Sequence, residues 1–276
     1  MPLVHPAEII PEAVATGHGV GAFNVIQLEL AEAIVEGAEA AGRPVILQIS
    51  QNCVKYHGRL APIATACQAL AAASAVPVAV HLDHAESAEL IGQALALGID
   101  SIMYDGSKLP DAANRAATAA IAALAHARGA WMEAELGEIG GKDGVHAPGV
   151  RTDPAEAAQF VRDTAVDSLA VAVGSSHAMT TRTAALDLEL IAAIHRQVAV
   201  PLVLHGSSGV PDADLASAIE AGMTKINIAT LLSRTFTDSV RTTLAGDERL
   251  VDTRKYFAPA RAAVAAAVSA LLEVIA

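Results

Sequence analysis

Val78-Ala79-Val80-His81-Leu82-Asp83-His84-Ala85-Glu86 is the stretch on which the interpretation of the fold depends. An apolar strand runs directly into two histidines that flank an aspartate, and a helical pattern follows at once over 86–97. Alternate residues of a strand share a face, so His81 and Asp83 are expected to point one way while His84 need not. Such an arrangement would let one residue bind a metal ion while its neighbour performs acid–base chemistry.

Two further histidines follow apolar strands in the same way. His177 ends the segment 171–177, and His205 comes directly after the apolar residues 202–204. Together with His84 they place three imidazoles at three strand ends, the pattern of a catalytic zinc site with three nitrogen ligands and an open position.

Two more side chains are candidates for this site. His81 could be a ligand, but a role in orienting another ligand is favoured. Glu135 is interpreted as a supporting carboxylate or a transient ligand, and its plainer interpretation is a buried hydrogen bond at a strand end. The remaining histidines are interpreted as packed or hydrogen-bonded residues: His5, His18, His57, His126, His146 and His195.

Apolar segments of strand length alternate with helical patterns along the whole chain. Strands are expected over 20–25, 44–49, 78–81, 101–104, 130–136, 168–173, 201–204 and 225–228. Helices are expected over 28–41, 62–73, 86–97, 111–128, 154–164, 186–197, 212–221 and 230–244, with a short helix over 7–15 before them and a last helix over 259–275. Eight β/α units in one domain spanning residues 1–276 predict an α/β fold, a closed (β/α)8 TIM barrel. An open doubly wound sheet is the rival, but no G-x-G-x-x-G follows the first strand.

The strand ends, unlike the strand starts, are polar. In a barrel these ends meet at one rim, where catalytic groups lie, so the active site is expected there. The polar strand-end residues are Asn24, Ser50, Asp83 with His84, Asp105, Glu135, His177, His205 and Asn227.

The overall charge of −12, from 30 acidic and 18 basic residues, argues against nucleic acid and against an anionic membrane as partners. Cys53 and Cys67 match no metal-binding spacing and no disulfide framework, which fits a reducing cytoplasm. The first ten residues lack the features of a signal peptide, and Pro77 breaks the apolar region 61–80. A cytoplasmic protein without membrane contact is therefore expected.

Two segments are candidates for a phosphate-binding site. One is a loop rich in glycine and serine, and the other is the end of a strand. Gly206-Ser207-Ser208-Gly209 follows the expected seventh strand, and the segment 224–230 ends the eighth at the start of a helix. Loops after the last two strands of such a barrel bind phosphate, because free amides and helix N-termini point at the anion.

These motifs resemble those of one family, the class II zinc-dependent ketose-bisphosphate aldolases that cleave fructose or tagatose bisphosphate. The resemblance covers nearly the whole chain, and its motifs are Ala22-Phe23-Asn24-Val25, His81-Leu82-Asp83-His84, Glu133-Ala134-Glu135-Leu136-Gly137 with Gly140-Gly141, Leu204-His205-Gly206-Ser207-Ser208-Gly209 and Lys225-Ile226-Asn227-Ile228-Ala229-Thr230.

The resemblance implies one zinc ion per chain on His84, His177 and His205, with Glu135 nearby, and Asp83 as the proton donor at the aldol hydroxyl. It leaves room for a monovalent cation near the phosphate, and it implies a homodimer or homotetramer in which Arg254 reaches a neighbouring subunit's substrate. The substrate-binding residues would be Asn24, Ser50, Ala178, Arg182, Gly206, Ser207, Ser208, Asn227, Ile228, Ala229, Thr230 and Arg254.

The sequence departs from the family pattern at four places. Ala178 replaces the glycine that usually follows the second zinc histidine, and Arg182 replaces a lysine. The loop reads Gly140-Gly141-Lys142-Asp143-Gly144 where Gly-Gly-x-Glu-Asp is usual, so the proton-abstracting base is missing or is Asp143. Ala229 stands where many fructose-bisphosphate enzymes have a polar residue and tagatose-type members have alanine.

The predicted function is reversible aldol cleavage of a ketose 1,6-bisphosphate to dihydroxyacetone phosphate and an aldehyde, a glycolytic reaction if the ketose is fructose and the aldehyde glyceraldehyde 3-phosphate. Alternatives are a tagatose-bisphosphate or other dihydroxyacetone-phosphate adduct, a metal-dependent hydrolase, and a non-catalytic aldolase partner subunit. A Schiff-base mechanism is disfavoured, because Lys225 is expected at the start of the eighth strand, on the opposite rim, while Lys108 and Lys142 lie in loops.

Overall fold

The structure is a computed structural model that describes residues 2–136 and 151–276. Its strands close into one parallel barrel in chain order, with β1 hydrogen-bonded to both β2 and β8. The predicted (β/α)8 barrel is confirmed. The strands are β1 (Val20–Asn24), β2 (Val45–Ser50), β3 (Val78–Ala85), β4 (Ser101–Tyr104), β5 (Trp131–Leu136), β6 (Ser168–Val171), β7 (Leu202–Leu204) and β8 (Met223–Ile228).

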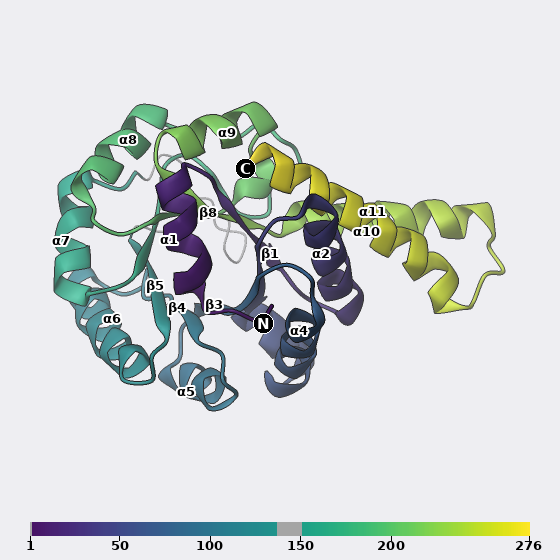
Figure 1. Cartoon of the computed structure of the whole chain (residues 1–276), viewed down its shortest axis with the longest axis horizontal. Coiled ribbons are helices and arrows are strands. Elements are labelled where there is room, and N and C mark those ends of the chain that lie inside the picture. Colours follow the sequence, from purple (N-terminus) through teal and green to yellow (C-terminus); the bar gives the residue numbers. More distant parts are fainter. Residues whose placement is uncertain (1, 137–150) are drawn as a thin grey trace.

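Helices surround the barrel and cover the outward faces of the strands (Figure 1). They are α1 (Pro6–Thr16), α2 (Leu28–Ala41), α3 (Gln51–His57), α4 (Ala61–Ala73), α5 (Ala88–Ala96), α6 (Asp111–His126), α7 (Pro154–Thr164), α8 (Leu188–Gln197), α9 (Asp212–Glu220), α10 (Thr230–Gly246) and α11 (Thr253–Val274). The short helix α3 was not predicted. It begins because the Ser50 hydroxyl accepts a hydrogen bond from the Cys53 amide.

Helix α1 packs on the barrel at the starts of the strands. Ile9, Ile10 and Ala13 share a buried cluster with apolar side chains of β1, β2 and β3. His5 and Glu8 form a capping box that fixes the start of this helix. The opposite rim, where the strands end, therefore remains for the site.

Strand β3 is longer than predicted: it continues past His81 to Ala85. Its pairing with β2 continues to Ser50 and Asp83, and its pairing with β4 shifts register between Leu82 and Ala85. Within this irregularity His84 adopts a left-handed conformation, with φ at 50°. The shift lets His84 join the rim although it is next to the inward-facing Asp83.

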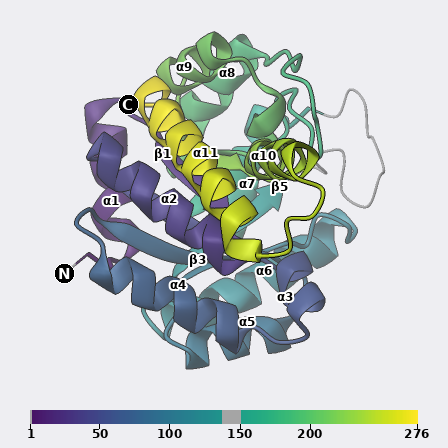
Figure 2. The ribbon, with the colours of Figure 1, turned by 90° about the vertical axis from the view of Figure 1, so that its right-hand side faces the viewer.

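Helices α10 and α11 run side by side and project from the barrel as an arm (Figures 1 and 2). Helix α11 starts at Thr253 and not at the predicted Pro259, because Asp252 caps it through the Arg254 amide. By length and composition alone α11 could cross a membrane. However, Val264, Val268 and neighbouring apolar residues are buried, and the helix packs along α2.

Candidate metal and substrate site

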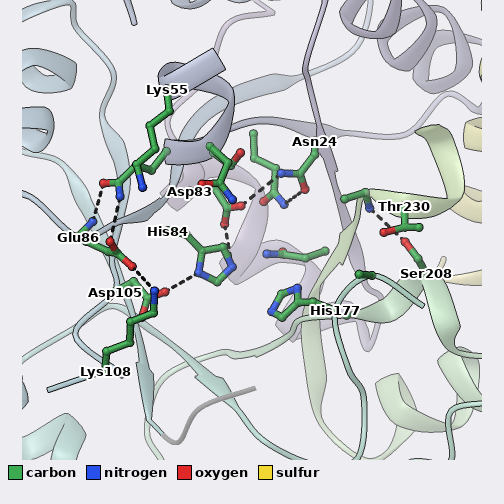
Figure 3. Close-up of a pocket in the computed structure, with 18 residues that line it drawn as sticks. Asn24, Lys55, Asp83, His84, Glu86, Asp105, Lys108, His177, Ser208 and Thr230 are labelled. Atoms are coloured by element: carbon green, nitrogen blue, oxygen red, sulfur yellow. Dashed lines mark hydrogen bonds and ion pairs between the residues drawn. The ribbon is translucent and has the colours of Figure 1, made fainter. Parts of the chain in front are cut away.

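Three histidines meet at the carboxyl-end rim, supplied by β3, the loop after β6 and the end of β7. The ring centroids of His84 and His205 are 4.7 Å apart, and those of His177 lie 5.3 Å from His84 and 5.7 Å from His205. Glu135 of β5 completes a group whose potential ligand atoms all lie within 4.8 Å of one another. Figure 3 shows His84 and His177 side by side in the pocket.

Hydrogen bonds fix how two of these rings face the centre of the group. Nδ1 of His84 lies 2.8 Å from Oδ2 of Asp105, which leaves Nε2 as its ligand atom. Nε2 of His205 lies 3.2 Å from Oε1 of Glu133, which leaves Nδ1. That buried Nδ1 lies 3.1 Å from Oε2 of Glu135. Three imidazoles, two of them held through their second nitrogen by a carboxylate, with Glu135 beside them, fit a zinc ion.

A layer of buried charge lies inside the barrel beneath the histidines. Lys225 contacts Glu133, with Nζ 3.0 Å from Oε2, and its side chain is 1% exposed. The expectation that Lys225 lies on the opposite rim is wrong: β8 begins at Met223, and Lys225 points into the barrel. Its ammonium is occupied by Glu133 and does not line the pocket, so it offers no free amine for a Schiff base.

These contacts shift the pKa values of several buried groups. Burial lowers the pKa of His205, but Glu133 and Glu135 more than offset this and raise it to about 9. Burial raises the pKa of Asp83, but electrostatic interactions with His84, Lys225 and His205 outweigh burial and hold it below its usual value. Without a metal ion, His205 is therefore protonated at neutral pH and Asp83 is ionised.

Asp83 belongs to a chain of polar side chains across three strands. The amide nitrogen of Gln48 donates to Oδ1 of Asn24 at 2.7 Å, and the Asn24 nitrogen donates to Oδ2 of Asp83 at 3.3 Å. The other carboxylate oxygen, Oδ1, is buried and makes no hydrogen bond within the described residues. It lies 4.0 Å from Nε2 of His84, and both residues line the cavity.

The two loops expected to bind phosphate are joined by one side chain. The Ser208 hydroxyl accepts hydrogen bonds from the amides of Ala229 at 3.2 Å and Leu231 at 3.1 Å. This ties the loop after β7 to the N-terminus of α10, a helix end that favours anions. Gly206 lies in the left-handed region, and a Cβ there would be 2.6 Å from the Ser176 carbonyl.

These groups line a cavity of about 230 Å³. Of the residues predicted at the site or its rim, it is lined by Asn24, Ser50, Asp83, His84, Asp105, His177, Ala178, Gly206, Ser208, Asn227, Ala229 and Thr230. Residues that the sequence reasoning did not assign to it are Gln48, Gln51, Asn52, Lys55, Glu86 and Lys108. Gln48 could have been recognised from the sequence, because it is the one polar residue in the apolar run 45–49. The others lie on α3 or in loops without a distinctive pattern.

Other predicted residues lie elsewhere. His205 and Glu135 are fully buried beneath the cavity, Ser207 is buried in the loop after β7, and Ile228 is buried at the end of β8. Arg182 donates to the Val210 carbonyl at 2.8 Å and pairs with Asp212 at 2.6 Å, at the start of α9.

Arg254 is 88% exposed near the tip of the arm and pairs with Asp252. Asp143 lies outside the described residues.

Comparison with known proteins gives one consistent result. The family model described as "Fructose-bisphosphate aldolase class-II" matches residues 4–276. The chain is 40% identical over 268 residues to a probable fructose-bisphosphate aldolase of Bacillus subtilis, covering 96% of this chain and 94% of the relative. It is 37% identical over 268 residues to a fructose-bisphosphate aldolase of Staphylococcus aureus, again covering 96% of this chain and 94% of the relative.

Two solved structures are similar over almost the whole fold. The YdjI aldolase of Escherichia coli K12 has a TM-score of 0.85 at 30% identity, over 99% of this chain and 97% of that chain. A putative fructose-1,6-bisphosphate aldolase of Coccidioides immitis has a TM-score of 0.86 at 30% identity, over 98% of this chain and 95% of that chain.

Proposed function

Since the chain belongs to the class II fructose-bisphosphate aldolase family, we propose that His84, His177 and His205 bind its catalytic zinc and that fructose 1,6-bisphosphate is its substrate. The protein is an aldolase, a carbon–carbon lyase of a family that depends on zinc. The observation that carries the residue assignment is the cluster of three imidazoles, two of which have their second nitrogen on a buried carboxylate.

One zinc ion per chain is proposed, with Glu135 at its edge. When bound, zinc would supply Lewis-acid polarisation of the substrate carbonyl. Asp105 and Glu133 keep His84 and His205 turned toward that position. A monovalent cation beside the phosphate remains a prediction.

Asp83 is proposed to move the proton of the aldol hydroxyl. Its lowered pKa keeps the carboxylate ionised at neutral pH, and Oδ1 is free of hydrogen bonds within the described residues. In the cleavage direction it accepts the hydroxyl proton, and in the condensation direction it returns that proton to the new alkoxide. Asn24 holds the carboxylate through its other oxygen.

The phosphate of the dihydroxyacetone half is proposed to bind at the loops after β7 and β8. Gly206, Ser208, Asn227, Ala229 and Thr230 line the cavity at the N-terminus of α10. An acidic protein needs such local positive potential to bind an anion. Ala178, from the loop after β6, completes this side, and Asn24 and Ser50 face it from β1 and β2.

Asp143 is proposed as the base that removes the carbon-bound proton of dihydroxyacetone phosphate. Within the segment 137–151 it is the one carboxylate that follows the Gly140-Gly141 pair. Glu135 is the next candidate, because it already belongs to the histidine group. An Asp143→Asn variant that exchanged this proton at the wild-type rate would assign the role to Glu135.

Tagatose 1,6-bisphosphate is the second candidate substrate, favoured by Ala229. A metal-dependent hydrolase would have no need of the paired phosphate loops, and a non-catalytic subunit would have no need of the complete Asp83 and histidine set. A cytoplasmic homodimer or homotetramer without membrane or nucleic-acid partners is proposed.

The test is cleavage of both bisphosphates by protein stripped of metal with a chelator and then supplied with zinc. We expect no cleavage by the stripped protein, recovery at one zinc per chain, and no inactivation by borohydride in the presence of substrate. Chelator-resistant cleavage that borohydride abolishes would contradict the zinc mechanism. A higher kcat/KM for the tagatose compound would reverse the choice of substrate.

A further inference from the structure

A buried ion pair lies inside the barrel beneath the proposed metal site. Nζ of Lys225 is 3.0 Å from Oε2 and 3.2 Å from Oε1 of Glu133, and each side chain is 1% exposed. Removing two charges from water costs several kcal/mol per ion, and apolar residues of similar volume often stabilise a protein as well or better. The gain in stability from this pair is therefore a weak reason for its presence.

Glu133 has a second contact that gives the pair another role. Its Oε1 accepts a hydrogen bond from Nε2 of His205 at 3.2 Å. The nitrogen on the other edge of the ring, Nδ1, faces Glu135 at 3.1 Å and belongs to the histidine group. Glu133 and Glu135 are two residues apart on β5 and so share its inward face, with Glu133 farther from the rim.

We propose that Lys225 and Glu133 are positioning residues that fix the tautomer and ring orientation of His205 and thereby set the zinc affinity of the site. Lys225 holds the Glu133 carboxylate in place, and Glu133 holds Nε2–H of His205. Nδ1 is then presented to the position between His84 and His177. This inference rests on the proposed metal site and extends it to two residues that do not line the substrate cavity.

The test replaces both members of the pair, because removing one would leave an unpaired buried charge. In Glu133→Leu/Lys225→Met the hydrogen bond to His205 is lost, whereas Glu133→Gln/Lys225→Met keeps a neutral acceptor. Zinc dissociation constants come from competition with a chelator. We expect a weakening of about 10–100-fold for the leucine variant, and of roughly threefold to tenfold for the glutamine variant, since a neutral acceptor bonds less strongly than a carboxylate.

Two further measurements distinguish a positioning role of the pair from a general loss of structure. The visible spectrum of the cobalt-substituted protein reports the geometry of the ligands, so it should change in the leucine variant and return toward wild type in the glutamine variant. The metal-free variants should melt close to the metal-free wild type. If the leucine variant does not fold, the zinc dissociation constant and the cobalt spectrum of the glutamine variant test the inference instead.

Ser101→Ala is the matched control, because it removes the hydrogen bond of an equally buried histidine, His81, at 2.7 Å. His81 is outside the metal-binding group, so zinc affinity should stay within about twofold. His84→Ala tests the site itself. Unchanged affinity and spectrum in the pair variants, with metal lost from His84→Ala, would overturn the inference. Full metal binding by His84→Ala would instead overturn the proposed site.

Discussion

Asp83 and His84 are adjacent in the sequence but have different environments and different proposed tasks. Asp83 is 2% exposed and is held by Asn24, while His84 is held by Asp105. A substitution of Asp83 can therefore be tested for its effect on zinc binding, and a substitution of His84 for its effect on proton transfer.

Asp83→Asn should abolish cleavage while metal binding is retained. The substitution keeps the shape of the side chain but removes the group that moves the hydroxyl proton. We expect kcat to fall about 10²–10⁴-fold, with zinc still bound at one per chain. Exchange of the donor proton of dihydroxyacetone phosphate should fall much less, since it does not involve that hydroxyl. Equal losses of exchange and cleavage would contradict this role.

Zinc binding should release a proton from His205. In the folded metal-free protein the pKa of His205 is about 9, above its ordinary value of about 6.5. The raised pKa stabilises the metal-free fold below about pH 6.5, and this contribution is lost as pH rises through 9. At pH 7.5 the proton must leave before Nδ1 can bind zinc.

Calorimetry of zinc binding in two buffers of different ionisation enthalpy gives the number of protons released. We expect about one at pH 7.5, and a zinc affinity that weakens about tenfold for each pH unit below 9. Release of much less than half a proton would show that His205 is already neutral.

The sequence identified most of the pocket but not the layer beneath it. The three histidines, Asp83 and Asn227 were predicted because all strand ends of a parallel barrel meet at one rim. Lys225 and Glu133 form an ion pair although they are 92 residues apart in the sequence, and the pair depends on which face of β8 points inward. Neither an apolar pattern on both faces of a strand nor a local motif specifies that.

At the scale of elements, the loops after β6 and β7 come into close contact. Gly206 has a φ of 68°, and a Cβ there would lie 2.6 Å from backbone atoms of Ser176, next to His177. By contrast, Gly42 has a similar φ of 63°, but a Cβ there would meet no atom within 4 Å.

Gly206→Ala should therefore displace His177 and weaken both metal binding and catalysis. A displacement of about 1 Å can cost on the order of 100-fold in rate, and we expect kcat/KM to fall by about that factor. Gly42→Ala is the control, because it puts an alanine at a similar φ without a clash, and it should remain within severalfold of wild type. Equal kcat/KM values for the two variants would show that the contact with Ser176 is unimportant.

The differences between predicted and observed elements have local causes. Helix α3 has little apolar periodicity, and its start depends on the cap from Ser50. The extension of β3 through His84 depends on a register shift against β4, a feature of pairing that a single strand does not encode. The long helical patterns of α2 and α7 were predicted to their observed ends.

At the scale of the whole molecule, the arm formed by α10 and α11 is the main departure from a closed barrel (Figures 1 and 2). Arg254 lies near its tip and is exposed. A basic residue on a projecting arm could reach the site of a second subunit, which is why a shared site is proposed.

Mixing two impaired variants, assayed at substrate concentrations well below KM, tests that sharing. In a heterodimer of Asp83→Asn and Arg254→Ala subunits, one site would have both native residues if Arg254 acts across the interface. We expect about a quarter of the wild-type activity from an equal mixture of freely exchanging dimers, and roughly a tenfold higher KM for Arg254→Ala alone. Light scattering should show at least a dimer. A fully active monomer, or a mixture without restored activity, would contradict the shared site.

The most direct test of a zinc-dependent aldolase site at this rim is exchange of the donor proton of dihydroxyacetone phosphate with deuterated water, followed by NMR. It requires neither the aldehyde partner nor the correct sugar epimer. We predict stereospecific exchange of one proton by the zinc-loaded protein, none after chelation, recovery on adding zinc, and none in His205→Ala, which should bind zinc poorly. Exchange that continues unchanged after chelation and in His205→Ala would contradict the account.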